Sequence, residues 1–201
     1  MMQNPAASSP AFSICIYCGS RPGHDAAFAA TAARIGHWIG RHGGQLVYGG
    51  GSGGLMGVVA DAALAAGARV VGVIPRSLME REHGHRGCTE LIVVETMHER
   101  KRIMAERADA FVALPGGIGT FEELFETWAW RQLGYHDKPL GLLNQDGYYD
   151  ALLAFAGHGV RSGFMDDGQM RLIDIDTHWQ PLLERLIAAA GFNAPVRVDA
   201  I

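Results

Sequence analysis

The sequence predicts a single-domain α/β fold, in which helices cover both faces of a doubly wound parallel sheet. Short runs rich in β-branched residues alternate with longer stretches of helical spacing, which is the pattern of repeated βαβ units. The expected strands are almost continuously apolar, as strands buried on both faces are. A length of 201 residues leaves room for one such domain rather than two.

Strands and helices are expected in alternation along the chain. The expected strands cover residues 12–17, 45–48, 69–74, 91–94, 110–114, 139–143 and 171–175. The expected helices cover about 25–42, 54–66, 97–108, 120–134, 147–161 and 177–190. We expect residues 12–191 to form the domain, with flexible tails at 1–11 and 192–201. Ligands bind at the carboxyl ends of the strands in such sheets, and the polar segment 76–90 is placed to cover that edge.

Composition narrows the possible functions. Apolar residues make up 48% of the chain and charged residues 19%, which suffices for a sizeable core. The net charge of −4 argues against a surface that coats nucleic acid. No apolar run reaches membrane-spanning length and no signal peptide is recognisable. Cys15 and Cys18 have CxxC spacing, but they lie in an expected strand, where they would face opposite sides. We therefore expect a cytoplasmic protein without a redox motif.

The first glycine-rich loop follows the strand at 45–48. Gly49, Gly51 and Gly54 satisfy a GxGxxG pattern, which can direct backbone N–H groups at phosphate. A dinucleotide site also needs an acid after the next strand, where this chain has Arg76. Arg76 could instead meet the 2′-phosphate of NADP, so an NADP site is a minor alternative. A tight turn that serves only packing explains the loop equally well, so phosphate contact by Gly50 and Gly51 stays open.

The second loop, LPGGIGTFEE at 114–123, is more specific. Its glycines free the backbone just before an expected helix, which predicts a phosphate site at the helix N-terminus. A capping box between Thr120 and Glu123 is the structural alternative, although it leaves the preceding Pro-Gly-Gly unexplained. Glu122 and Glu123 cannot both point at a phosphate, so one of them must face another group.

Basic residues gather after the strand at 91–94. Thr96 and Glu99 form a second possible capping box, which places Arg100, Lys101 and Arg102 near the first turn of a helix. Cations there oppose the helix dipole, which makes sense if an anion lies in front of them. A solvated basic face is the alternative. After the first strand, Ser20 could either cap the next helix or donate to phosphate.

Several of these motifs together resemble one known family. PGGIGTFEELFETW is similar to the PGGxGTxxE signature of the LOG ("Lonely Guy") family, and MHERK, GGGSGGLMG and CGSRPG look like the same family. The resemblance covers about residues 12–190. It implies a Rossmann-like fold, a homodimer, and hydrolysis of cytokinin riboside 5′-monophosphates to free base and ribose 5-phosphate. We expect this reaction to need no cofactor and no metal.

The resemblance also implies site residues. Arg100 and Glu123 would be the catalytic pair. Lys101, Gly116, Gly117, Gly119, Thr120 and Glu122 would line the nucleotide site, and Glu82 would contact the substrate. Apart from the resemblance, the loops add Ile118, Ser20, Gly50 and Gly51 as candidate substrate contacts. LMERE around Glu82 departs from the commoner family pattern, so its assignment is weaker.

Members of this family have often been labelled lysine decarboxylases, and the lysines test that label. Pyridoxal phosphate needs a lysine for its Schiff base, and the chain has only Lys101 and Lys138. Lys138 precedes a strand, away from the carboxyl edge, so decarboxylation is disfavoured. The remaining alternatives are a general AMP nucleosidase and a nucleotide-binding protein without catalysis.

Breaking an N-glycosidic bond places positive charge on the ribose, which a carboxylate can stabilise. We expect Glu123 to do this with a low pKa, because it lies near a helix N-terminus. Arg100 would stay protonated and grip phosphate or ribose. His98 is a weak candidate for protonating the base. His83 and His85 lack a convincing third metal ligand, so no metal site is expected.

Two surfaces remain as expectations. Substituents of the base would meet apolar residues such as Trp128, Trp130 or Met79, or the partner subunit. The aromatic helix at 120–134 is a candidate dimer surface.

Overall fold

The computed structural model describes residues 9–191 and contains one seven-stranded sheet, in the order β4-β3-β2-β1-β5-β6-β7. Every neighbouring pair is parallel. The strands are β1 (Ser13–Tyr17), β2 (Gln45–Tyr48), β3 (Arg69–Pro75), β4 (Glu90–Val94), β5 (Ala110–Ala113), β6 (Leu140–Leu143) and β7 (Ile173–Asp176). The doubly wound parallel sheet expected from the sequence is confirmed.

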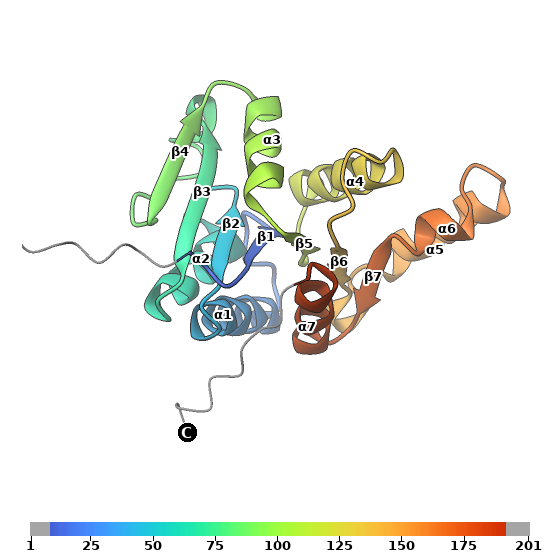
Figure 1. Ribbon diagram of the computed structural model, residues 1–201, viewed down its shortest axis with the longest axis horizontal. Helices are drawn as coiled ribbons and strands as arrows, with labels where there is room; N and C mark the ends of the chain where they lie inside the picture. Colours follow the sequence, from blue (N-terminus) through green and yellow to red (C-terminus); the bar gives the residue numbers. More distant parts are fainter. Residues whose placement is uncertain (1–8, 192–201) are drawn as a thin grey trace, which may run out of the picture.

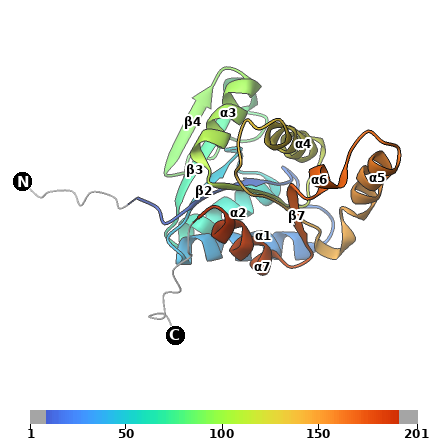
Figure 2. The same cartoon turned by 45° about the vertical axis from the view of Figure 1, so that its right-hand side comes forward.

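Helices cover the two faces of the sheet (Figures 1 and 2). Helices α1, α2 and α7 pack on one face, and α3, α4 and α5 pack on the other. Their bounds are α1 (Ala26–Arg41), α2 (Gly54–Ala65), α3 (Met97–Arg107), α4 (Ile118–Gln132), α5 (Asp150–Arg161), α6 (Asp167–Met170) and α7 (Trp179–Ala189).

Alternate residues of each central strand feed two separate core clusters. Ile14 and Ile16 of β1 join the cluster beneath α1, α2 and α7, whereas Cys15 and Tyr17 join the one beneath α3, α4 and α5. This is the two-residue period of a strand whose faces are both covered. Cys18 lies in the first cluster, so Cys15 and Cys18 do face opposite sides, and both are free thiols.

The chain reverses its direction of winding between β1 and β5. Strands β2, β3 and β4 follow β1 outward on one side, and β5, β6 and β7 follow on the other. The loops after β1 and β5 therefore meet at the centre, where Gly19 N donates to Pro115 O at 3.2 Å. Such a reversal opens a crevice at the carboxyl edge of the sheet and is the usual ligand site of this architecture.

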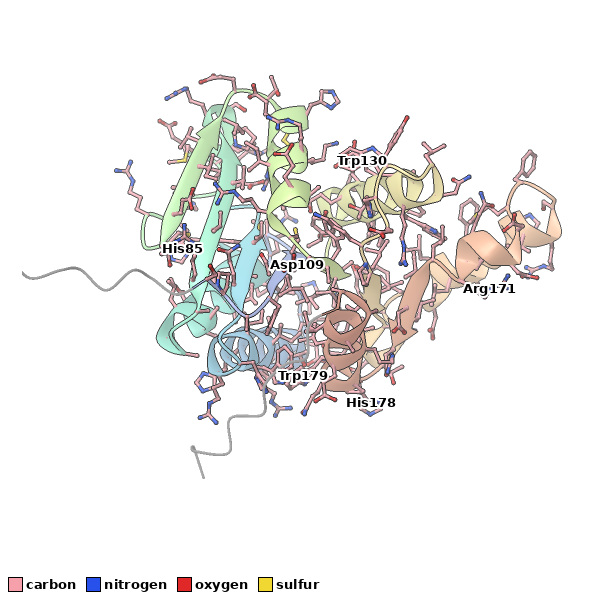
Figure 3. All side chains as sticks on the ribbon, viewed as in Figure 1. His85, Asp109, Trp130, Arg171, His178 and Trp179 are labelled. Atoms are coloured by element: carbon pink, nitrogen blue, oxygen red, sulfur yellow. The ribbon has the colours of Figure 1, made fainter. Side chains whose placement is uncertain are left out.

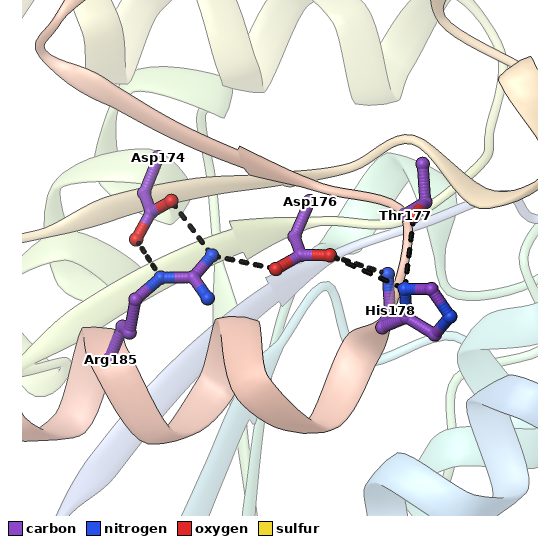
Figure 4. Close-up of polar contacts among 5 residues, drawn as sticks. All are labelled: Asp174, Asp176, Thr177, His178 and Arg185. Atoms are coloured by element: carbon purple, nitrogen blue, oxygen red, sulfur yellow. Dashed lines mark hydrogen bonds and ion pairs between the residues drawn. The ribbon is translucent and has the colours of Figure 1, made fainter.

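The C-terminal edge departs from the expected pattern. Residues 171 and 172 form a turn after the short helix α6, whose capping box joins Asp166 and Gln169, so the last strand begins at Ile173. Helix α7 is tied to that strand by Arg185, which donates to Asp174 and Asp176, while Asp176 also accepts from the backbone of His178 (Figure 4).

The expected tails lie largely outside the described residues, which exclude 1–8 and 192–201. Within the described part, Ala11 already donates its backbone N–H to Gly43 O at 2.9 Å. Over residues 9–191, no helix has both the length and the apolar character needed to cross a membrane.

Candidate active site

Arg100 and Glu123 lie in one cavity at the reversal of the sheet. This cavity of about 130 Å³ is also lined by Glu82 and Thr120, so residues from α3, α4 and the segment between β3 and β4 converge on it. It adjoins a larger cavity of about 630 Å³, with which it shares Ser20, Gly117 and Ile118. The combined space is within the usual size of a small-molecule site.

The N-terminus of α4 opens into both cavities. Gly117 is the N-cap, and among the described residues the N–H groups of Ile118, Gly119 and Thr120 have no acceptor. Free N–H groups at a helix N-terminus attract an anion such as phosphate. The expected capping box of Thr120 and Glu123 is wrong, because the helix starts at Ile118 and places Thr120 inside its first turn.

The first glycine loop has a different role. Leu55 N and Met56 N, at the start of α2, both donate to Gly19 O, which occupies the N–H groups that a phosphate would need. Gly50 and Gly51 are buried against neighbouring chain and do not line the two cavities described above. The packing explanation of this loop therefore fits the structure better than phosphate contact.

Arg100 is buried with a relative exposure of 5% and is fixed by the sheet. Its Nε donates to Val73 O at 3.1 Å, and its Nη2 donates to Gly49 O at 2.8 Å. Nη2 also lies 3.4 Å from a carboxylate oxygen of Glu82. A solvated basic face is therefore wrong for Arg100. It holds for Arg102, which is exposed and pairs with Glu106.

Lys101 turns from α3 towards α4, where its Nζ forms ion pairs with Glu122 and Glu126. Partial burial opposes its charge, but the hydrogen bonds to these carboxylates raise the pKa of Lys101 above its ordinary value. Glu122 thus faces a lysine, which resolves the expected conflict with Glu123. Neither Lys101 nor Glu122 lines the cavity that holds Arg100.

Burial raises the pKa of Glu123 to about 7, even though the positive charge of Arg100 acts in the opposite direction. Glu122 and Glu82 add negative charge that raises it further. The expected low pKa is therefore wrong. Loss of water around the carboxyl group disfavours its charged form. At neutral pH, both protonation states of Glu123 are populated.

The segment 76–90 covers the carboxyl edge, as expected, and we call it the lid. Arg81, Glu82 and His83 of the lid border the site. Arg76 leaves the end of β3 and pairs with Glu95 at 3.1 Å on the surface. This pair occupies the arginine that an NADP site would use for a 2′-phosphate.

Ser20 borders both cavities and does not cap α1, whose N-cap is Asp25. His98 is exposed and lines neither cavity. His85, by contrast, has both ring nitrogens engaged, with Tyr48 and with Asp61.

The aromatic side chains at the site differ from those expected. Trp128 is buried, and its Nε1 donates to Gln169 O, so it belongs to the core. Trp130, marked in Figure 3, and Met79 do not line the two cavities either. Phe28 and Tyr148 form the aromatic wall of the larger cavity instead. They come from α1 and from the loop after β6, and no sequence motif singles them out.

Both lysines are committed to structural contacts. Lys138 Nζ donates to Ala105 O and Ala108 O at the C-terminal end of α3, and Lys101 is paired as described. A Schiff base needs an unprotonated amine. The positions of both lysines thus disfavour a pyridoxal phosphate enzyme.

Comparison with known proteins agrees with the geometry. The family model described as "Possible lysine decarboxylase" matches residues 56–188. The probable cytokinin riboside 5′-monophosphate phosphoribohydrolase LOG4 of Oryza sativa subsp. japonica is 48% identical over 182 residues, which are 90% of this chain and 79% of that protein. The chain belongs to the LOG family. The LOG2 phosphoribohydrolase of Arabidopsis thaliana is also 48% identical, over 80% of this chain and 75% of its own length.

Solved structures show the same fold at greater distance. The molybdenum cofactor binding protein of Rippkaea orientalis is 20% identical to this LOG-family chain, with a TM-score of 0.66 over 92% of this chain and 98% of that one. At this identity, the likeness concerns the fold alone.

Proposed function

We propose that this LOG-family chain hydrolyses the N-glycosidic bond of nucleoside 5′-monophosphates, namely cytokinin riboside 5′-monophosphates and AMP. The products are the free adenine-type base and ribose 5-phosphate. The observation that carries the proposal is the shared cavity of Arg100 and Glu123 beside the unpaired N-terminus of α4. The relatives named above as phosphoribohydrolases support the same activity.

The 5′-phosphate would bind at the N-terminus of α4. The N–H groups of Ile118, Gly119 and Thr120 lie at the positive end of the α4 helix dipole, where they would bind the phosphate. Arg21 and Arg81 border the larger cavity and add positive charge around it. This arrangement would leave the sugar of the nucleotide beside Glu123.

The chemistry then follows from charge. As the bond between C1′ and the base nitrogen lengthens, positive charge grows on the ribose, and ionised Glu123 stabilises it. Glu123 also accepts a proton from the water whose oxygen bonds to C1′. The electron pair of the broken bond passes to the base. Because its pKa lies near 7, the same carboxyl group can return the proton to the departing base.

Arg100 has a fixed role in this scheme. Its two hydrogen bonds to Val73 O and Gly49 O hold the guanidinium in place, so the substrate meets a positioned cation. The positive charge also stabilises the ionised form of Glu123.

The proposal includes a homodimer in a reducing, cytoplasmic compartment. Exposed apolar side chains of α4, Ile118 and Phe125, support α4 as the subunit contact. Three free cysteines support the compartment. Light scattering on the parent and on Phe125→Lys tests the contact: a dimeric parent and a monomeric variant support it, and an unchanged mass argues against it.

Incubation with AMP and, separately, with isopentenyladenosine monophosphate tests the activity. Free base and ribose 5-phosphate are measured after each incubation. We expect both substrates to release base, with the prenylated one faster. Equal rates would favour a general AMP nucleosidase. Tight binding of AMP without release of ribose 5-phosphate would favour a binding protein and contradict the proposal.

A further inference from the structure

His85 joins the lid to strand β2 and to helix α2. Its Nδ1 lies 2.9 Å from the hydroxyl of Tyr48 on β2, and its Nε2 lies 3.3 Å from a carboxylate oxygen of Asp61 on α2. The side chain of His85 is only 12% exposed, and Figure 3 marks it on the β3–β4 side of the molecule. Tyr48 is fully buried and its hydroxyl also lies 3.2 Å from Cys88 Sγ.

One set of hydrogen bonds pairs His85 Nδ1, the Tyr48 hydroxyl and the Cys88 thiol. Nδ1 of His85 accepts from the Tyr48 hydroxyl, that hydroxyl accepts from the Cys88 thiol, and Nε2 lies 3.3 Å from a carboxylate oxygen of Asp61. Burial raises the pKa of Tyr48 far above its ordinary value, so the phenol keeps its proton as a donor. Burial likewise raises the pKa of Cys88. The phenol of Tyr48 and the thiol of Cys88 are therefore paired in their uncharged forms.

Backbone contacts with the first glycine loop hold the lid between His85 and Glu82. His85 N donates to Gly50 O at 2.8 Å, and Gly84 pairs with Gly51 in an isolated bridge. Ser52 N donates to Glu82 O at 3.2 Å. The lid thus lies along the first glycine loop, which brings the Glu82 carboxylate to 3.4 Å from Arg100 Nη2.

We propose that His85 is a positioning residue, which holds Glu82 beside Arg100 through its contacts with Tyr48 and Asp61. This inference rests on the proposed function, which makes Glu123 the catalytic carboxylate. The effect of this positioning is that the negative charge of Glu82 lies close to Arg100 and Glu123. The first glycine loop then serves as the backbone segment against which the lid is held.

The position of Glu82 matters because it acts on Glu123. Burial raises the pKa of Glu123 most, Arg100 lowers it, and Glu122 and Glu82 raise it further. Lys101 of α3 is the remaining charged group that acts on this carboxyl, and it lowers the pKa. Cys15, Tyr17 and Cys18 also lie near Glu123, but burial raises their pKa values and keeps them uncharged. If the lid moves away, the negative charge of Glu82 leaves while Arg100 stays bound to Val73 O and Gly49 O, and this loss of negative charge lowers the pKa of Glu123.

Carbon-13 NMR of protein labelled at the glutamate carboxyl carbon measures this effect without catalysis. The Glu123 resonance is identified by its loss in Glu123→Gln, and its titration midpoint is then compared in the parent, His85→Ala, Glu82→Gln and the double variant. Arg86→Ala is the matched control, because Arg86 is exposed on the same lid and has no polar partner among residues 9–191. Circular dichroism confirms that each variant is folded.

We expect a midpoint near 7 in the parent and in Arg86→Ala. His85→Ala and Glu82→Gln should each lower it by about half a pH unit or more, and His85→Ala should lower it less when Glu82 is already Gln. An unchanged midpoint in His85→Ala would overturn the proposal, as would an equal lowering in both backgrounds. If His85→Ala does not fold, Tyr48→Phe removes the same contact and is judged by the same criteria.

Release of base from AMP is measured on the same samples. A parent that releases no base would contradict the proposed function, while the titration would still decide whether His85 positions Glu82. The two failures are therefore distinguishable.

Discussion

Lys101 on α3 forms an ion pair with Glu122 on α4, and this pair leaves Glu123 as the carboxylate that enters the cavity. Two adjacent glutamates at a helix start would otherwise compete for the same space and repel a phosphate. The lysine is itself buried, with 9% of its side chain exposed, so its charge depends on these carboxylates.

Replacing this lysine should therefore impair the neighbouring residue. In Lys101→Met, Glu122 loses its partner and the positive charge near Glu123 disappears, so the pKa of Glu123 should rise. We expect kcat/KM for AMP at pH 7 to fall about tenfold and the acidic limb of its pH profile to move upward. The surface variant Arg102→Ala serves as the control. A profile that Lys101→Met leaves unchanged would show that the ion pair is irrelevant to Glu123.

Stability should depend on pH through Glu123. Its pKa in the folded protein, about 7, lies above its ordinary value of 4.5. The folded state therefore holds the proton more tightly, and the stability that this group contributes is present below about pH 4.5 and is lost as the pH rises through 7.

Glu123→Gln cannot ionise, so the variant should gain stability over the parent at pH 8. We expect a gain on the order of 2 kcal/mol, after allowance for partial solvent access. The gain should shrink as the pH falls towards 5. Urea unfolding at both pH values measures it, and a gain independent of pH would contradict the assignment of the raised pKa.

The turn before α4 offers a matched pair of glycine variants. A Cβ on Gly116 would collide with Thr120 Oγ1 and lie 2.8 Å from Gly19 N, whereas a Cβ on Gly117 would meet nothing within 4 Å. We expect Gly116→Ala to lower the free energy of unfolding by about 1–3 kcal/mol. Gly117→Ala should leave stability unchanged but raise KM, because its methyl group stands at the phosphate site. Equal stability losses in the two variants would refute this difference.

Arg100→Ala should damage both the fold and the site. The carbonyls of Val73 and Gly49 would lose buried donors, and Glu82 would lose its cation. We expect a loss of about 2–4 kcal/mol in the free energy of unfolding. Activity should therefore be compared in Arg100→Lys, which keeps the charge; its kcat/KM should fall at least about tenfold. If Arg100→Ala is as stable as the parent and Arg100→Lys has the parent's kcat/KM, Arg100 is not part of the site.

Much of the architecture could be predicted from local patterns. The apolar strands and glycine-rich junctions place the loops after β1 and β5 at one edge, and the capping box of Thr96 and Glu99 is confirmed. The proximity of Arg100 and Glu123 could be predicted from the sequence, because each follows a strand of one parallel sheet.

The remaining features depend on contacts between residues far apart in the chain. The raised pKa of Glu123 comes from burial, which no local motif reveals. The start of α4 was misplaced because its N-cap is a glycine without a capping side chain, while Thr120 imitates a cap. Tyr148 reaches the site because its hydroxyl donates to Gly116 O, across 32 positions of sequence.

The most direct test of the account measures AMP binding by calorimetry and single-turnover release of adenine in the parent and in Glu123→Gln. The account predicts that the variant binds AMP with a Kd within about threefold of the parent and releases adenine about a thousandfold more slowly. Release at the parent rate would contradict the claim that Glu123 is the catalytic carboxylate.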